Sequence, residues 1–222
     1  MNNFLRKQLA LHVLTDREWS RGRDTLTVAT AALDGGATVI QLRDKKASTR
    51  TLVEEGLALR ALTRERGALL IVNDRIDVAL AVEADGAHVG QDDDMPVELA
   101  RKLLGPDRIL GVSAGNLEEA TTAVVSGADY LGVGPIYATK TKANAGEPIG
   151  LSLLTELARR YTIPLVAIGS IKAENAAAVV QAGATGIAVI SAVVSAEDVV
   201  AATRRLHNVV TTLYPLFHLF YP

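Results

Sequence analysis

Three polar residues, Gln41, Arg43 and Lys45, are spaced two apart and follow the apolar pair Val39 and Ile40. This pattern is typical of the end of a β-strand. Since successive side chains of a strand face opposite ways, the three would project together from that strand end. A guanidinium group beside an ammonium group suits a phosphate or diphosphate better than a neutral ligand. An ordinary strand end with solvated charges is the alternative.

Carboxylates follow the next two apolar segments, at Asp74 and Asp93. If these segments are neighbouring strands, both carboxylates can approach one ion, and hard oxygen ligands beside basic residues are what Mg²⁺ needs when it bridges a protein to a diphosphate. Taken singly, Asp74 could be a helix N-cap and Asp93 a turn residue. The adjacent Asn73 and the basic residues favour the metal, but spacing does not choose among Asp92, Asp93 and Asp94.

Residues 134–148 form a long connection that is rich in threonine, lysine and glycine. Loops of this length are usually functional, and its Thr139, Thr141 and Lys142 have the chemistry of a lid that closes on phosphate oxygens and expels water. A solvated surface loop would have a similar composition.

Small residues end the last two apolar segments, at Gly169 with Ser170 and at Ile190 with Ser191. Backbone N–H groups near the helix starts at such positions often hold a phosphate. Two phosphate-sized sites would suit two phosphorylated substrates.

Histidine chemistry is not expected. His88 has apolar neighbours and is predicted to be a packed strand residue rather than a general base, while His12, His207 and His218 fall outside the expected strand ends. Because no Ser–His–Asp set can be assembled, covalent hydrolysis is disfavoured. Catalysis by positioning and electrostatics fits the collected residues better.

The elements that must gather these residues alternate regularly along the chain. Strands are expected at 9–15, 38–42, 68–72, 85–90, 108–112, 130–133, 165–168 and 186–190, and helices at 25–33, 48–66, before 83, 97–104, 117–126, 152–161, 175–182 and 196–209. Eight βα units within 222 residues predict a single-domain (β/α)8 TIM barrel, with an open doubly wound sheet as the alternative. In a barrel the polar residues that follow each strand, including Ser113 after the fifth, meet at one end.

The barrel domain is expected to span residues 1–210, followed by an aromatic tail at 211–222 to which we assign no chemistry. Pro215 and Pro222 argue against a regular helix in this tail.

Composition limits the function classes. The net charge of −2 argues against nucleic-acid binding and against a polybasic membrane surface. The absence of cysteine excludes disulfides and thiol nucleophiles, and it fits a reducing cytoplasm. The charged segment 1–8 and the lack of a long apolar run predict neither a signal peptide nor a membrane span. We therefore expect a cytoplasmic protein that acts on small phosphorylated molecules, and a homo-oligomer is left open.

Several blocks, in order, resemble the thiamine-phosphate synthase family between about Leu11 and Leu206. They are Gln41-Leu-Arg-Asp-Lys45, Val72-Asn-Asp74, Asp85-Gly-Ala-His-Val-Gly-Gln-Asp-Asp93, Gly111-Val-Ser113, Gly132-Val-Gly-Pro-Ile-Tyr137, Thr139-Lys-Thr-Lys142 and Ile190-Ser191. The resemblance implies a (β/α)8 barrel that joins a hydroxymethylpyrimidine diphosphate to a carboxylated thiazole phosphate. Thiamine phosphate would form, with release of diphosphate and CO₂.

The same resemblance implies roles for individual residues. The pyrimidine diphosphate would contact Gln41, Leu42, Arg43, Asp44, Lys45, Asn73, Ser113 and Lys142, of which Arg43, Lys45, Ser113 and Lys142 would be catalytic. Asp74 and Asp93 would bind one Mg²⁺ ion per subunit. The thiazole phosphate would contact Thr139, Lys140, Thr141, Ser170, Ile190 and Ser191. The metal and the basic groups would stabilise the departing diphosphate, so that a pyrimidine cation forms and the thiazole nitrogen attacks it.

One departure concerns Ser170, because the family usually has a Gly-Gly pair where this chain has Gly169-Ser170. If the second position needs a positive φ, serine is strained there.

Two alternative functions stay open. A related branch of the fold isomerises the thiazole precursor with a histidine just after the fifth strand, but residues 113–116 read Ser-Ala-Gly-Asn. A non-catalytic phosphate-ligand sensor would need no Mg²⁺ ligands.

Overall fold

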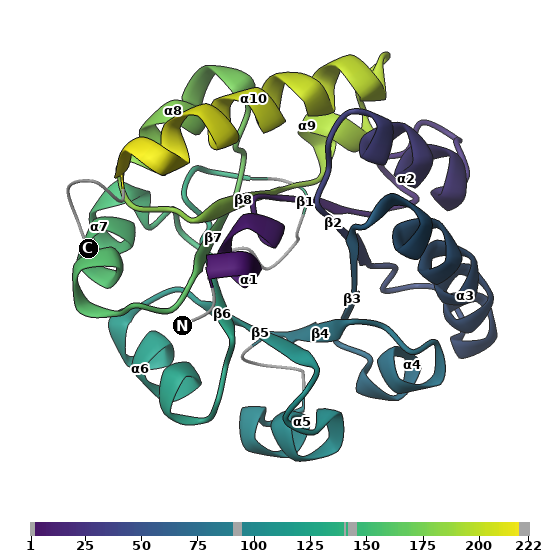
Figure 1. Cartoon of the computed structure of the whole chain (residues 1–222), viewed down its shortest axis with the longest axis horizontal. Coiled ribbons are helices and arrows are strands. Elements are labelled where there is room, and N and C mark those ends of the chain that lie inside the picture. The colour runs from purple at the N-terminus through teal and green to yellow at the C-terminus, as the bar shows by residue number, and fades with distance from the viewer. Residues whose placement is uncertain (1–2, 91–94, 140, 142–145, 218–222) are drawn as a thin grey trace.

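The strands close into the barrel that the sequence predicts. The structure is a computed structural model, and it describes residues 3–90, 95–139, 141 and 146–217. Eight parallel strands pair in chain order, and β8 pairs with β1 to complete the ring (Figure 1). The strands are β1 (Leu11–Leu14), β2 (Val39–Leu42), β3 (Leu69–Asn73), β4 (Gly86–Val89), β5 (Ile109–Ala114), β6 (Tyr130–Val133), β7 (Leu165–Ile168) and β8 (Gly186–Val189). The single-domain (β/α)8 barrel is therefore confirmed.

Helices surround the barrel. They are α1 (Asn3–Gln8), α2 (Thr25–Asp34), α3 (Thr49–Arg66), α4 (Ile76–Ala81), α5 (Val97–Leu104), α6 (Leu117–Val125), α7 (Gly150–Arg160), α8 (Ala173–Gln181), α9 (Ser191–Val194) and α10 (Val199–Phe217). Local signals set the ends of α3: the Ser48 hydroxyl accepts a hydrogen bond from the N–H of Thr51, and Gly67 ends the helix with a φ of 65°. Within the described residues, no helix has the length and apolar character needed to cross a membrane.

Strand side chains alternate between two apolar cores. Ile40 and Leu42 of β2 face outward and pack in the large core between the barrel and the helices. Val39 faces inward and packs with Leu69 and Ile71 of β3 inside the barrel. Both faces of each strand are thus buried, which explains why the strands are apolar runs without a polar face.

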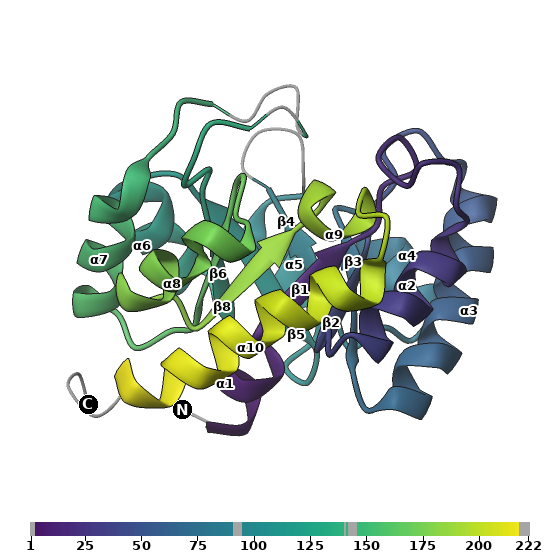
Figure 2. The same cartoon turned by 90° about the horizontal axis from the view of Figure 1, so that it is seen from above.

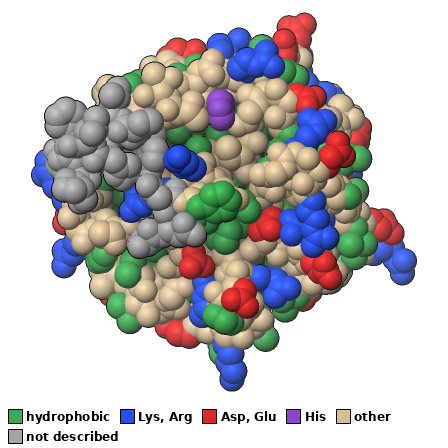
Figure 3. Space-filling view, viewed as in Figure 1, with side chains coloured by type: hydrophobic (Ala, Val, Ile, Leu, Met, Phe, Trp, Pro, Cys, Tyr) green, Lys and Arg blue, Asp and Glu red, His purple; other side chains and the backbone are tan. Residues whose placement is uncertain are grey.

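The short helix α1 covers the end of the barrel at which the strands begin (Figure 1), and Figure 2 shows it at the opposite end from α9. Leu5 of α1 and the following Leu9 pack against the interior core. Apolar side chains show at the centre of this face, around α1, where Phe4 is exposed, with charged groups toward the rim (Figure 3). α1 is not predicted from the sequence, because six residues are too few to show a helical period.

The last helix differs from the prediction. α10 begins at Val199 and continues to Phe217, so the expectation that Pro215 prevents a regular helix in the tail is wrong. A proline has a φ that fits a helix, and in the last turn it removes only one backbone hydrogen bond. α10 packs on α8 and α2 and completes the ring of helices. The one-turn helix α9 was also missed, because four residues carry no periodic signal.

Candidate active site

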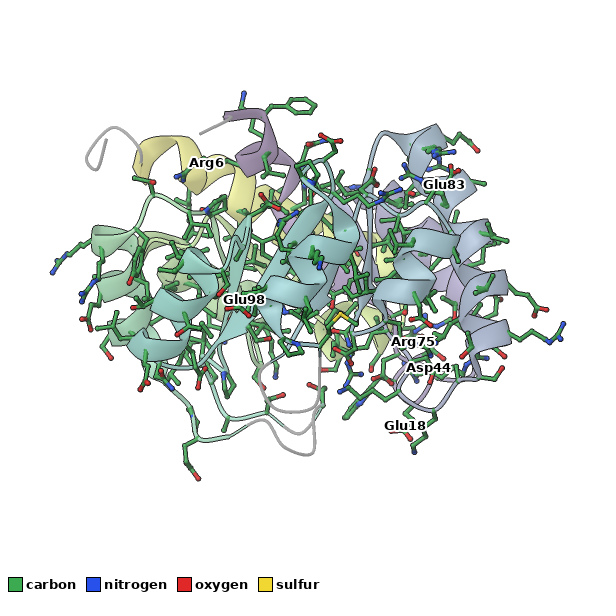
Figure 4. All side chains as sticks on the ribbon, turned by 90° about the horizontal axis from the view of Figure 1, so that it is seen from below. Arg6, Glu18, Asp44, Arg75, Glu83 and Glu98 are labelled. Carbon is green, nitrogen blue, oxygen red and sulfur yellow. The ribbon has the colours of Figure 1, made fainter. Side chains whose placement is uncertain are left out.

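A pocket opens at the carboxyl ends of the strands, and all eight strands contribute to its wall. The predicted site residues that line it are Gln41, Arg43, Lys45, Asn73, Asp74, Ser113, Thr139, Thr141 and Ile190. Figure 4 shows that Glu18, Asp44 and Arg75, which follow β1, β2 and β3, lie at the end of the molecule opposite Arg6 and Glu83. The barrel therefore brings together side chains that are far apart in the sequence.

The end of β2 supplies the basic wall of the pocket. Gln41, at 4% exposure, faces inward, and Arg43 and Lys45 follow on the same side. A guanidinium nitrogen of Arg43, Nη1, lies 2.6 Å from a carboxylate oxygen of Asp16, which follows β1. Both side chains are mostly buried, with 12% and 11% of their surface exposed. The carboxylate thus fixes the direction in which Arg43 presents its remaining N–H groups.

The other two residues of this segment, Leu42 and Asp44, lie outside the pocket wall. Leu42 is 1% exposed and packs in the core beneath the helices. Asp44 accepts hydrogen bonds from the side chain of Arg17 at 2.7 Å and from the N–H groups of Lys46 and Ala47. Partial burial alone would raise the pKa of Asp44, but these hydrogen bonds outweigh it, so the pKa is lowered. Asp44 therefore stays ionised and orders the turn after β2.

Asp74 has an unusual backbone for a residue with a side chain, with a φ of 63°. Its N–H donates to the carbonyl of His88, and its carboxylate lies 3.1 Å from the ammonium of Lys45. The cap of α4 is Arg75, so the alternative in which Asp74 caps that helix is wrong. Residues with a strained backbone conformation are found most often at active sites and ligand-binding sites, where the conformation positions a functional side chain.

The side chain of Asp74 is chemically suited to coordinate magnesium, because it presents a hard carboxylate oxygen at the pocket rim. The second predicted ligand, Asp93, lies outside the described residues, as do Lys140 and Lys142. The described part of the chain contains no group of three or more acidic, histidine or cysteine side chains that could hold a metal. A magnesium ion at Asp74 would thus need Asp93, substrate oxygens or water to complete its shell.

His88 is a pocket residue that its apolar sequence neighbours do not reveal. Its ring lines the pocket, and its Nε2 lies 3.0 Å from the hydroxyl oxygen of Ser113. Its Nδ1 lies 3.0 Å from the hydroxyl oxygen of Tyr130. The available signal was the alternation of β4, which turns His88 inward together with Gly86 and leaves Ala87 to the outer core.

His12 lies before the carboxyl end of β1, as expected, but its ring lines the inner part of the pocket, which the sequence did not reveal. It is 1% exposed, and neither ring nitrogen has a hydrogen-bond partner among the described residues. Burial lowers the pKa of His12 to about 3, with a smaller contribution from the nearby His88. His12 is therefore neutral at physiological pH and acts as part of the pocket floor.

The sequence of the chain matches one family model and many relatives that carry the same name. The family model described as thiamine monophosphate synthase matches residues 11–193. Thiamine-phosphate synthase from Chloroflexus aurantiacus is 61% identical over 201 residues, which cover 90% of this chain and 92% of the relative. The corresponding protein from Moorella thermoacetica is 57% identical over 204 residues, or 92% and 97% of the two chains. The chain belongs to the thiamine monophosphate synthase family.

A solved structure supports the same assignment. Thiamine phosphate pyrophosphorylase from Pyrococcus furiosus superimposes with a TM-score of 0.87 at 47% identity, covering 94% of this chain and 98% of that one. The family resemblance inferred from the sequence blocks is thus confirmed. Thiamine-phosphate synthases are transferases, and membership identifies this chain as an enzyme of that class.

The departure from the family pattern at Ser170 has a structural consequence. Ser170 has a φ of 49°, so this position does require the left-handed conformation that favours glycine. Its hydroxyl donates a 2.6 Å hydrogen bond to the carbonyl of Ala138. The bond connects the turn after β7 to the loop after β6, and its free energy offsets part of the cost of the positive φ at Ser170. Neither Ser170 nor Ser191, the first residue of α9, lines the pocket, whereas the adjoining Gly169 and Ile190 do.

The loop after β6 is attached to the end of β7 and to the turn that follows it. The N–H of Ile136 donates to the carbonyl of Ile168 at 2.8 Å, and the N–H of Tyr137 donates to that of Gly169. Farther on, the hydroxyls of Thr139 and Thr141 lie 2.9 Å apart on the pocket wall. The two threonines thus provide a hydroxyl pair opposite the basic residues of β2.

Proposed function

We propose that the enzyme couples 4-amino-2-methyl-5-(diphosphooxymethyl)pyrimidine to a thiazole ethyl phosphate or its carboxylated form, giving thiamine phosphate and diphosphate, with CO₂ as a further product from the carboxylated form. The observation that carries this proposal is the convergence of Arg43, Lys45, Asn73 and Asp74 on one pocket wall. Two cations, an amide and a carboxylate suit a diphosphate with its magnesium ion. The similarity to thiamine-phosphate synthases over nine-tenths of the chain supports the choice of substrates.

In this proposal the basic side chains bind and orient the diphosphate. Arg43 is held by Asp16 and Lys45 is held by Asp74, so both cations are directed before the substrate arrives. Preorganised positive charge stabilises the negative charge that grows on the leaving diphosphate as its C–O bond breaks. Asp74 would hold a Mg²⁺ ion together with Asp93, and the ion would supply further positive charge.

The opposite wall is proposed to hold the thiazole phosphate. The hydroxyls of Thr139 and Thr141 are donors for phosphate oxygens, and the N–H groups at Gly169 and Ile190 lie beside the pocket. Lys140, Ser170 and Ser191 remain predicted contacts, as does Lys142 for the diphosphate. Holding the two substrates in one pocket places the thiazole nitrogen against the carbon that loses diphosphate.

An isomerase of the related branch is disfavoured by the structure after β5. The side chain of Asn116 accepts a hydrogen bond from the N–H of Glu119 at 2.9 Å and caps α6. The N–H of Gly115 donates to the Glu119 carboxylate at 2.7 Å. This segment therefore has a capping role, and it offers no imidazole where that branch needs one.

The test is to mix the purified protein with both substrates, with and without Mg²⁺, and to measure thiamine phosphate. We expect product only when both substrates and the metal are present. Binding of the diphosphate without turnover under any of these conditions would instead indicate a sensor. If thiamine phosphate formed at an equal rate after complete removal of divalent cations, the proposed role of magnesium would be refuted. The proposed coupling reaction would still be supported. A cytoplasmic location remains a sequence-based prediction, and a homo-oligomer is left open.

A further inference from the structure

Three side chains on β6, β4 and β5 form a hydrogen-bonded series. The series begins deep in the pocket, inside the barrel, and continues outward along the pocket wall. The Tyr130 hydroxyl lies 3.0 Å from Nδ1 of His88, and Nε2 of His88 lies 3.0 Å from the hydroxyl of Ser113. All three residues line the pocket, but Tyr130 is 1% exposed and lies deepest. Ser113 is the member predicted to contact the diphosphate substrate.

Two glycines make room for this series. A Cβ atom at Gly111 would lie 2.1 Å from Cζ of Tyr130 and 2.4 Å from its hydroxyl oxygen. A Cβ atom at Gly132 would lie 2.7 Å from Cε1 of His88. Contacts under about 3 Å are not tolerated between carbon atoms. Any larger residue at either position would displace a ring, so the backbone is built around the two aromatic side chains.

The direction of the hydrogen bonds follows from Tyr130. Burial raises the pKa of Tyr130, so the phenol stays neutral and carries one proton that must be donated. Among the described residues, the recorded partner of its hydroxyl is Nδ1 of His88. The ring of His12 lies near, with its centroid 5.4 Å from that of Tyr130, but its nitrogens make no hydrogen bond within the described part of the chain. For a neutral imidazole, donation from Tyr130 to Nδ1 leaves the His88 proton on Nε2.

The consequence reaches Ser113. When Nε2–H donates to the Ser113 oxygen, the serine proton cannot point back at His88, and it is directed to an acceptor elsewhere. In the other tautomer, Nε2 would accept the serine proton, and the serine would present only lone pairs to an anionic ligand. A phosphate oxygen is attracted in the first case and repelled in the second.

We propose that Tyr130 and His88 are positioning residues that set the polarity of Ser113, so that its hydroxyl acts as a donor toward the departing diphosphate. The proposal rests on the proposed function for the identity of the ligand, whereas the tautomer of His88 is a property of the protein alone. Its effect on the reaction should be largest where negative charge develops, and it should therefore lower kcat more than it changes substrate binding.

The first test is ¹⁵N NMR of the histidine rings in the substrate-free protein at about pH 8, above the ordinary pKa of an imidazole. The chain has four histidines, and the His88 signals are assigned by their loss in a His88→Gln variant. We expect the proton on Nε2 in the wild type and a mixed or reversed tautomer in Tyr130→Phe, which keeps the ring beside Gly111. A wild-type proton on Nδ1 would overturn the proposal, even if Tyr130→Phe does not fold.

The second test is kinetic. Tyr130→Phe should lower kcat about tenfold while KM for the pyrimidine diphosphate changes less than twofold. The matched control is Tyr161→Phe, which removes a hydroxyl that bonds to Thr121 at 2.8 Å on the outer surface and should leave both constants unchanged. An unchanged kcat in Tyr130→Phe would overturn the proposal. Absence of thiamine phosphate formation by the wild type would instead refute the proposed function, and the NMR result would still decide the tautomer.

Discussion

The ion pair between Asp16 and Arg43 is expected to be required for binding the diphosphate, although Asp16 does not line the pocket. The Asp16 carboxylate lies 2.6 Å from Nη1 of Arg43, and both side chains are mostly buried. Replacing Asp16 with alanine removes a hydrogen bond between charged groups, whose loss typically costs about 1.5–3 kcal/mol. If this cost falls on the placement of Arg43, kcat/KM for the pyrimidine diphosphate should fall about 10-fold to 150-fold.

An opposing effect is smaller. A carboxylate near a diphosphate repels it, so its removal would improve binding. In this protein, however, the Asp16 charge is already neutralised by the adjacent Arg43, so little net repulsion of the diphosphate remains. Loss of orientation should therefore dominate. Asp16→Asn, which keeps an acceptor and removes the charge, should fall between the wild type and Asp16→Ala.

The assay is the rate of thiamine phosphate formation with varied diphosphate substrate and saturating thiazole phosphate. Arg17→Ala is the matched control, because Arg17 is adjacent in the sequence and pairs with Asp44 in the same loop after β2 and with Glu55 of α3. It should change kcat/KM less than threefold. A kcat/KM for Asp16→Ala within threefold of the wild type would refute the reasoning, and an equal loss in Arg17→Ala would show that general loop order is what matters.

Other predictions concern single residues. Ser170→Ala and Ser170→Gly both lose the hydrogen bond to Ala138, but only alanine is strained at the positive φ of this position. The unfolding free energy of Ser170→Ala in urea should therefore be about 1 kcal/mol lower than that of Ser170→Gly. Equal stabilities of the two variants would contradict the strain at this position. The pKa of His12 is about 3 in the folded protein, which is below its value in the unfolded chain. The unfolded chain therefore takes up a proton first as the pH falls, and the folded state loses stability below the unfolded pKa. Between pH 7.5 and 5.5 the wild type should lose about 1 kcal/mol more than His12→Leu in urea titrations, and parallel curves would contradict this. Asp74→Ala and Asp93→Ala should each abolish most activity with an unchanged circular dichroism spectrum, and normal turnover at limiting Mg²⁺ would remove that residue from its role. Lys142→Ala should slow coupling more than it weakens thiazole binding measured by calorimetry, whereas equal loss of binding for both substrates would contradict that role.

The sequence was sufficient for the barrel because its signals are local and repeated. Each strand is a short apolar run, and glycines such as Gly67 end the helices where the pattern predicts. Elements without a repeated signal were missed, namely α1 and α9, and the effect of Pro215 on α10 was overestimated. Short helices depend on tertiary contacts, such as those of Leu5 with the barrel interior, which no local pattern reveals.

The sequence also predicted much of the pocket wall, because alternation along β2 assigns Gln41 and Arg43 to one face and parallel strands end at one side. It did not predict which side chains meet across strands. The partners Asp16 and Arg43 are 27 residues apart, and His88 and Tyr130 are 42 apart. The stagger between barrel strands sets these contacts, and a strand's own sequence does not encode the stagger. Only the tertiary structure decided that His88 and His12 face the pocket and that Ser170 is held at a positive φ, because each depends on neighbours brought close by closure of the ring.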